Sequence, residues 1–219
     1  MIGSGENELG ELLGTLQGHA RPVDSIQISR DAKGRLLIVS GSNDNTIKIW
    51  EEQEDGSFKV RTLRHWCSVE SVHMNRDANG RLVIVSRSSD NGDIQIWKEQ
   101  EDGSFKVRIL KRDGRFKVRI LQDGLGWINA VQMSIDANGR LEIVSGSQIG
   151  NIEIWQEQEN GSFKVKILQG EIQGDEGAIF TVQMSRDANG RMVIVSAGLD
   201  GVIQIWQSQK AYLGLLGLL

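Results

Sequence analysis

Short runs of apolar and polar residues alternate along this chain, and clusters of turn-forming residues separate the runs. Within residues 23–63, the run Val23–Ser29 places Ile26 and Ile28 on one side, with polar residues between them. The next run, Arg35–Gly41, is almost continuously apolar, as expected of a strand that is buried on both faces. Both patterns predict β-strands.

Two more short runs complete the same stretch. Thr46–Trp50 alternates with a period of two residues, and Phe58–Leu63 follows it. Turn clusters at 31–34, 42–45 and 54–56 separate the four runs. Four short strands joined by tight turns predict an antiparallel meander, which is the unit of a β-propeller blade. A helix is disfavoured because β-branched residues dominate the runs.

The same block occurs four times in the chain. It reads Asp-Ala-(Asn/Lys)-Gly-Arg and, after about ten residues, Ile-x-Ile-Trp. We therefore predict an all-β fold, a β-propeller of four-stranded antiparallel blades with four blades per chain. The expected repeats are about 17–63, 64–121, 122–168 and 169–206.

The strands of the later repeats follow from the first one. The innermost strands are expected at Val69–Asn75, Ile128–Ser134 and Ile179–Ser185. The second strands are expected at Arg81–Arg87, Arg140–Gly146 and Arg191–Ala197. The third strands end at Trp97, Trp155 and Trp206, and the fourth strands are expected at Phe105–Leu110 and Phe163–Leu168.

The fourth repeat has no outer strand after Trp206, so closure of the ring needs a strand from elsewhere. We expect residues 11–16 to pair with the last three strands, which removes both open sheet edges. Residues 207–219 form an apolar tail that competes for this position, and 1–10 are expected to be a flexible segment. Repeat two also carries a tandem copy of its outer strand at 116–121, interpreted as a tolerated insertion.

Charge and composition exclude several classes of partner. The 219 residues include 25 basic and 29 acidic ones, well mixed, with a net charge of −4. This balance predicts neither a nucleic-acid-binding face nor a membrane-binding patch. Cys67 is the only cysteine, so no disulfide can form within the chain. The N-terminus lacks the features of a signal peptide, and we expect a cytoplasmic protein.

Repeat one carries a family resemblance. It reads Thr-Leu-Gln-Gly-His at 15–19 and later Leu-Ile-Val-Ser-Gly-Ser-Asn-Asp-Asn-Thr-Ile-Lys-Ile-Trp at 37–50. This resembles the WD-repeat family of β-propellers, and the resemblance extends from Leu12 to Trp206. It implies a buried hydrogen-bonded network of His, Ser, Asp and Trp in each blade. The matching residues are His19, Ser40, Asp44 and Trp50; His65, Ser86, Asp90 and Trp97; Ser145 and Trp155; and Ser196, Asp200 and Trp206.

Two other interpretations of these motifs are weaker. Ser, His and Asp together invite comparison with a hydrolase triad, but no Gly-x-Ser-x-Gly elbow is present. The Asp-Ala-Asn-Gly-Arg block also resembles the FG-GAP type of propeller repeat, which implies a calcium site. Asp77 and Asn79 offer few oxygens, and Arg81 stands where another acid would help. We therefore expect no enzyme activity, no cofactor and no metal.

The expected function is that of a non-enzymatic scaffold. The WD-repeat resemblance implies that protein or peptide binds to the loops joining each outer strand to the next innermost strand. Exposed aromatic residues beside charges are typical of binding hot spots. The candidates are Trp66, Trp127, His65, Arg87, Arg21 and Phe180, although Trp66 and Trp127 are equally compatible with capping the blade ends.

Two further alternatives concern ligands. A carbohydrate-binding, lectin-like propeller would stack one tryptophan per repeat on sugar, but the repeated tryptophans lie inside a structural motif. The innermost strands also repeat a polar residue, at Gln27, His73, Gln132 and Gln183. For this ring, hydrogen bonding between blades is favoured over a ligand role.

Four blades are few for a closed ring, because propellers have typically about four to eight and this family usually about seven. Three solutions are open: a strained four-bladed monomer, a partial ring, or two chains pairing into an eight-bladed ring. An uncovered blade face would be a large apolar patch, which soluble proteins avoid. We favour the dimer, in which such faces cover each other.

Overall fold

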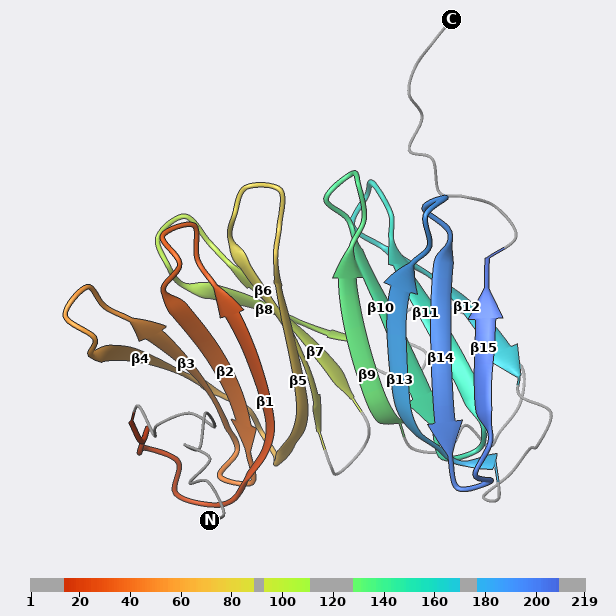
Figure 1. Cartoon of the computed structure of the whole chain (residues 1–219), viewed down its shortest axis with the longest axis horizontal. Helices are drawn as coiled ribbons and strands as arrows, with labels where there is room; N and C mark the ends of the chain where they lie inside the picture. Colours follow the sequence, from red (N-terminus) through yellow and green to blue (C-terminus); the bar gives the residue numbers. More distant parts are fainter. Residues whose placement is uncertain (1–13, 89–92, 111–127, 170–176, 209–219) are drawn as a thin grey trace, which may run out of the picture.

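The computed structural model of the chain describes residues 14–88, 93–110, 128–169 and 177–208. These residues form four antiparallel sheets arranged as the blades of a four-bladed β-propeller (Figure 1). The predicted all-β fold and its blade count are confirmed. No helix among the described residues is long and apolar enough to cross a membrane.

Each blade is a meander in chain order. Blade one contains β1 (Val23–Arg30), β2 (Leu36–Ser42), β3 (Thr46–Glu52) and β4 (Phe58–Arg64). Blade two contains β5 (Val69–Arg76), β6 (Leu82–Ser88), β7 (Ile94–Glu99) and β8 (Phe105–Leu110). Blade three contains β9 (Ile128–Ile135), β10 (Leu141–Ser147), β11 (Asn151–Glu157) and β12 (Phe163–Gln169). Blade four contains β13 (Ile179–Arg186), β14 (Met192–Gly198) and β15 (Ile203–Gln207).

The Asp-Ala-x-Gly-Arg block is a structural turn between the first two strands of each blade. In blade one, Asp31 Oδ1 accepts hydrogen bonds from the amides of Lys33 and Arg35, at 2.8 and 2.9 Å. Asp31 Oδ2 accepts from Nε of Arg35 at 2.8 Å, and Gly34 has φ 78°. The carboxylate is thus used inside the turn. No group of three or more His, Cys, Asp or Glu side chains in the described ranges is placed to hold a metal ion.

Successive blades pack face against face. We call the face toward the preceding blade the leading face and the face toward the following blade the trailing face. In the joint between blades one and two, the trailing face contributes Leu37, Val39, Ile47 and Ile49, and the leading face contributes Val69, Val72, Leu82, Ile84 and Trp97. Equivalent clusters join blades two and three and blades three and four. Burial of these side chains is what holds the blades together.

Each joint also has polar contacts of its own. Arg61 on β4 pairs with Glu99 on β7 at 2.6 Å, across the joint of blades one and two. Lys98 on β7 pairs with Glu157 on β11 at 2.8 Å, across the next joint. Arg186 on β13 pairs with Glu142 on β10 across the last. One pair repeats, because Arg108 on β8 lies 3.6 Å from Glu157 at the positions of Arg61 and Glu99. The pairs Lys98–Glu157 and Arg186–Glu142 have no equivalent at the other joints of the described residues.

The array is open between blade four and blade one. The leading face of blade one exposes Ile26 and Ile28 by 63% and 66%, and the trailing face of blade four exposes Ile203 and Ile205 by 68% and 72%. Packing contacts run instead between successive blades, which Figure 1 shows as a row from β4 to β15. The innermost strands of the four blades lie toward the middle of this row.

The expected closing strand is not seen in the described part of the chain. Residues 14–16 lie outside any strand, and β15 is hydrogen-bonded to β14 alone in its sheet. The remainder of the expected strand at 11–13, the expected flexible segment 1–10, the tandem copy at 116–121 and the tail from 209 all lie outside the described residues. The pairing of 11–16 with blade four remains a prediction.

Glycine is required where one blade approaches the next most closely. A Cβ added at Gly41 would lie 2.6 Å from Cγ1 of Val69 and 2.9 Å from Cγ1 of Val72. We therefore expect Gly41→Ala to lower the free energy of unfolding by about 1–3 kcal/mol, because the joint is overpacked. Urea unfolding measures this effect. Gly14→Ala, with no atom within 4 Å of the added Cβ, is the control; equal losses in both variants would contradict the prediction.

Candidate functional site

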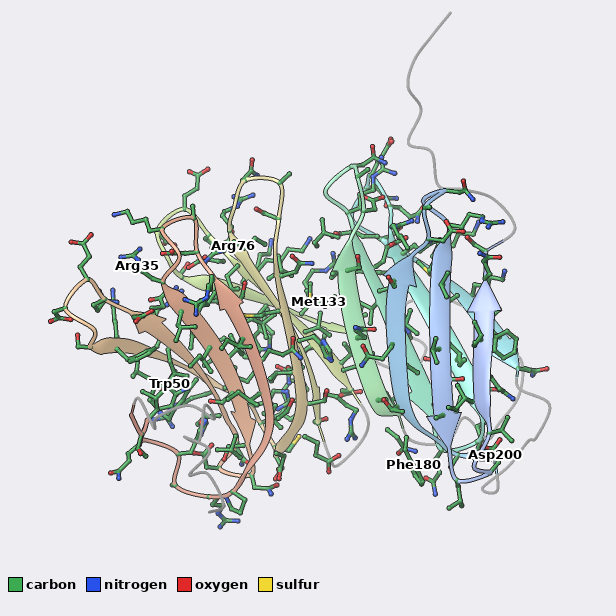
Figure 2. All side chains as sticks on the ribbon, viewed as in Figure 1. Arg35, Trp50, Arg76, Met133, Phe180 and Asp200 are labelled. Atoms are coloured by element: carbon green, nitrogen blue, oxygen red, sulfur yellow. The ribbon has the colours of Figure 1, made fainter. Side chains whose placement is uncertain are left out.

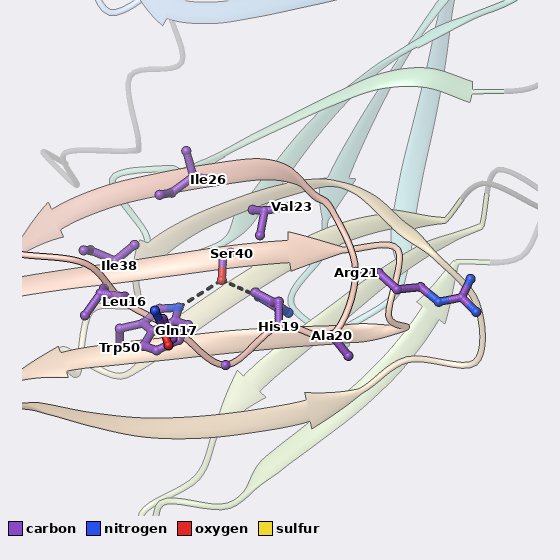
Figure 3. A pocket seen from close by; sticks show the side chains of 11 residues that line it. Leu16, Gln17, His19, Ala20, Arg21, Val23, Ile26, Ile38, Ser40 and Trp50 are labelled. Carbon is purple, nitrogen blue, oxygen red and sulfur yellow. Dashed lines mark hydrogen bonds between the residues drawn. The ribbon is translucent and has the colours of Figure 1, made fainter.

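Blade one contains a chain of buried hydrogen bonds that starts at Trp50. Trp50 Nε1 donates to Ser40 Oγ at 2.9 Å, and Ser40 Oγ lies 2.7 Å from His19 Nε2. His19 Nδ1 lies 2.9 Å from Asp44 Oδ2. Because a carboxylate can only accept, we assign the ring proton to Nδ1, so that Nε2 accepts from the Ser40 hydroxyl. Figure 3 shows His19, Ser40 and Trp50 converging in this way.

Asp44 anchors the network to the turn between β2 and β3. Its carboxylate also accepts from Thr46 Oγ1 at 2.6 Å and from the Ala20 amide at 2.9 Å. Burial raises the pKa of Asp44, but hydrogen bonds from Thr46, Ala20 and His19 outweigh it and hold this pKa well below the usual range. The carboxylate stays ionised and fixes the segment before β1 against blade one.

Blades two and three retain only part of the predicted network. Trp97 Nε1 donates to Ser86 Oγ at 3.0 Å, and Trp155 Nε1 donates to Ser145 Oγ at 3.2 Å. His65 does not repeat the geometry of His19, because its Nδ1 lies near Gln95 Nε2, at 3.4 Å. Asp90 lies outside the described residues. In blade three, Ser145 donates instead to Glu153 Oε2, at 3.3 Å.

In blade four the predicted network is not formed within the described residues. Trp206 Nε1 is buried without a hydrogen-bond partner there, although Ser196 is only 1% exposed. Asp200 Oδ1 accepts from the Val202 amide at 3.0 Å and so stabilises its own turn. The predicted hydrogen bond between Trp206 and Ser196 is therefore wrong. The network weakens from blade one to blade four.

The Ser40–His19–Asp44 arrangement has the connectivity of a hydrolase triad. Ser40 is 3% exposed, however, and its oxygen already accepts a hydrogen bond from Trp50 while its proton is directed to His19. A nucleophile needs an accessible oxygen. The geometry supports a structural role for these three residues.

The loop between β4 and β5 and the residues just before β1 and β13 lie at one end of the blades, which we call the loop-bearing face. Figure 2 shows Phe180 and Asp200 at this end and Arg35 and Arg76 at the opposite end, where the ion-paired turns lie. Phe180 is 56% exposed at an irregularity between Ile179 and Thr181. The exposed aromatic residues therefore occur at the end that lacks the repeated turns.

Five of the six predicted binding residues are described by the structure, and they divide into two groups. Trp66, Phe180 and Arg21 are exposed, as expected of binding residues, whereas His65 and Arg87 are 6% and 9% exposed. Trp127 lies outside the described residues. His65 and Arg87 therefore do not share the exposure of the other three, and a direct contact of either with a partner stays a prediction.

Arg87 is buried because it occupies a joint between blades. It stands at the position of Gly41 and Gly146, pairs with Glu70 and donates to the Ile128 carbonyl at 2.9 Å. Its guanidinium thus ties blade two to blade three. The sequence showed that Arg87 replaces a glycine, but its side chain was expected at the rim of the loop-bearing face.

Two exposed residues on this face were missed. Leu199 is 60% exposed and Val202 is 44% exposed, in the turn between β14 and β15. The Leu199 amide donates to the Ala178 carbonyl at 2.9 Å, which links this turn to the start of blade four. The available signal was an apolar residue where the equivalent turn of blade one has Asn43.

At the joint of blades three and four, the polar ring of the innermost strands makes bonds between blades, as favoured from the sequence. Gln132 Nε2 donates to Gln183 Oε1 at 3.1 Å, and Gln132 Oε1 accepts from the Met184 amide. His73 holds the equivalent position in blade two, and burial lowers the pKa of its imidazole to about 4. At neutral pH this side chain is uncharged.

The leading face of blade one carries an open pocket of about 700 Å³. Its walls include Val23, Ile26 and Ile38, together with Trp50 and the segment that carries His19 (Figure 3). Trp50 is only 5% exposed despite the open face. The reason is that residues before β1 lie across it, with Gly18 in close contact.

Comparison with known proteins bears on this network. Residues 10–51 match the family described as WD domain, G-beta repeat. This segment is a WD40 repeat. The match covers His19, Ser40, Asp44 and Trp50, the complete hydrogen-bonded network, so the resemblance found in the sequence is confirmed for the WD40 repeat where its motif is strongest.

Three curated proteins share a segment of similar length with the chain. It is 48% identical over 56 residues to nuclear distribution protein PAC1-1 of Uncinocarpus reesii and 45% identical over 56 residues to nuclear distribution protein nudF of Aspergillus niger. It is 39% identical over 57 residues to pre-mRNA-processing factor 19 of Oryza sativa subsp. japonica. The matched segments cover 26%, 26% and 25% of this chain and only 12%, 12% and 10% of these relatives.

Removal of the central hydroxyl tests the contribution of the network. We expect Ser40→Ala to lower the free energy of unfolding by about 1–3 kcal/mol, because Trp50 and His19 each lose a partner in a buried site. The matched variant is Ser196→Ala in blade four, where Trp206 makes no such bond within the described residues. Its loss of stability in urea unfolding should be smaller. Equal losses would show that the network is not what stabilises blade one.

The buried histidines predict acid sensitivity. Burial lowers the pKa of both His65 and His73 from 6.5 to about 4. As the pH falls from 6.5 to 4, the unfolded chain binds protons that the folded chain does not, so stability is lost by at most about 1.4 kcal/mol per pH unit for each histidine.

Replacement of His73 by glutamine, the residue at this position in the other three blades, isolates the contribution of His73 to the pH dependence of stability. His73→Gln should make the urea midpoint less dependent on pH between 6.5 and 4, while carboxylate effects remain in both proteins. The measurement is a set of urea titrations across this range. An unchanged pH dependence would contradict a depressed pKa at His73.

Proposed function

We propose that this chain is a non-enzymatic interaction module that binds a protein or peptide through its loop-bearing face. WD40-repeat propellers typically serve as scaffolds for protein interaction, which supports the general class. The observation that carries the finer proposal is the difference between the two ends of the blades. Trp66 and Phe180 are 51% and 56% exposed at the loop-bearing end.

The opposite end offers little for such an interaction. Its carboxylates are engaged in the turns, where Asp31, Asp77 and Asp187 each pair with the arginine four residues later. Large aromatic side chains give more binding free energy per residue than exposed ion pairs do. Arg21 adds an exposed positive charge to the loop-bearing face. A peptide with apolar and acidic residues fits this combination.

The carbohydrate-binding alternative has less support. The repeated residues Trp50, Trp97 and Trp155 are 5%, 7% and 9% exposed. Their indole groups donate to serine hydroxyls inside the blades. A sugar needs an accessible aromatic face for stacking, which these side chains do not offer.

Selection from a phage-displayed peptide library tests the proposal. Peptides that bind the immobilised chain should lose at least about tenfold in affinity for the double variant Trp66→Ala/Phe180→Ala, because each truncation of a hot-spot residue costs on the order of 1–2 kcal/mol. Fluorescence anisotropy of a selected peptide measures the dissociation constants.

The control variant changes the opposite end. Lys33→Ala removes a side chain that is 67% exposed beside the Asp-Ala-Lys-Gly-Arg turn, and it should leave the affinity unchanged. Selected peptides that bind the double variant as tightly as the natural chain would contradict the proposed face.

A further inference from the structure

Two blade faces remain uncovered at the ends of the array, and each has the residues of a buried face. On β15, Ile203 pairs with Ala197, as Ile47 pairs with Gly41 in blade one. Ile203 is 68% exposed, whereas Ile47 is fully buried. Likewise, Ile205 is 72% exposed, whereas Ile49, its equivalent in blade one, is fully buried. The trailing face of blade four is thus built for a neighbour that the described residues of one chain do not supply.

The leading face of blade one shows the complementary difference. Ile26 pairs with Ser40, as Val72 pairs with Ser86 in blade two. Ile26 is 63% exposed, whereas Val72 is fully buried under the trailing face of blade one. Every interior leading face of this kind is covered by a trailing face with two isoleucines from the third strand. Those of blade four are Ile203 and Ile205.

Polar groups on the two open faces match as well. In the first joint, the Val72 amide donates to Ser25 Oγ at 3.1 Å, and in the third the Met184 amide donates to the Gln132 side chain. The register places Thr181 of β13 at the position of Ser25.

The second pair of polar positions follows the same register. Gln183 of β13 stands at the position of Gln132. The amides that correspond to those of Val72 and Met184 belong to Ile26 and Ile28 on β1. A blade-one face placed on blade four would therefore find acceptors for both amides.

We propose that a second copy of this chain docks on these faces, so that blade four of each copy covers blade one of the other and an eight-bladed ring closes. A covering face needs a whole sheet, such as Val23–Arg64. A second copy brings both missing faces at once, in two identical joints related by a two-fold axis.

The pocket on blade one is explained by the same contact. Its apolar wall includes Ile26, Ile38 and Trp50, which correspond to residues that the isoleucines of a preceding blade cover at the interior joints (Figure 3). In the proposed ring, Ile203 and Ile205 of the second copy fill it. The large apolar surface at each end of the array is removed from water in one step.

Light scattering coupled to size-exclusion chromatography tests the ring with the full chain. The expected molar mass is twice the chain mass of 24.3 kDa. A mass equal to one chain at concentrations up to about 100 μM would overturn the proposal, since such an interface should bind at least at micromolar level. Masses that grow with concentration beyond two chains would also overturn it, because they indicate an open filament.

Charge placed on either face provides the sharper test. Ile26→Asp/Ile28→Asp and Ile203→Asp/Ile205→Asp should each give monomers, because both joints of either variant contain a damaged face. These side chains are exposed in the single chain, so circular dichroism should show an unchanged β-fold. Mixing the two variants should restore a one-to-one dimer through the one joint that pairs two undamaged faces.

Two controls separate the ring from other effects. Val107→Asp changes a valine that is 43% exposed in an interior blade, and it should leave the dimer intact. Trp66→Ala should do the same, because the loop-bearing face is not part of the joint. Dimers that survive both double substitutions would refute the proposed interface, while the peptide-binding proposal would be unaffected.

Discussion

Burial of one blade face against the next is the interaction on which the rest of this structure depends. A single blade has a leading and a trailing apolar face, and neither can be hidden within one meander. In the joint of blades one and two, Val39 and Ile49 are fully buried against Val69 and Val72 of the next blade. The hydrogen-bonded network of blade one fixes its turns and the segment before β1, but the joints place the blades and so position the loops that they carry.

Much of the fold could be predicted because each repeat encodes its strands locally. Alternation located β1 to within one residue, and turn residues such as Gly34 marked its end. Side-chain contacts were harder to predict where a residue faces another blade. Arg87 was expected at a rim, yet it is buried because its partners, Glu70 and the Ile128 carbonyl, are brought together only by packing of blades two and three.

The same distinction applies to the candidate site. The sequence pointed to Trp66 and Phe180 as exposed residues, because Trp66 lies in the loop between β4 and β5 and Phe180 lies at the start of β13, next to the connection between blades. It did not identify Leu199, whose exposure depends on the turn between β14 and β15. The network was predicted fully for blade one, where every member of the motif is present. It failed for Trp206, because a matching serine in the sequence does not ensure contact.

The joint-specific ion pairs have a consequence for how the chain finds its native order. Nearly identical apolar surfaces on every repeat would let blade two fold onto blade four almost as well as onto blade three, a source of frustration in the folding landscape. Lys98 with Glu157 and Arg186 with Glu142 are pairs that the other joints of the described residues do not repeat, so a wrong neighbour would leave these pairs unformed. These charged pairs favour the correct order of blades among repeats whose apolar faces are otherwise interchangeable.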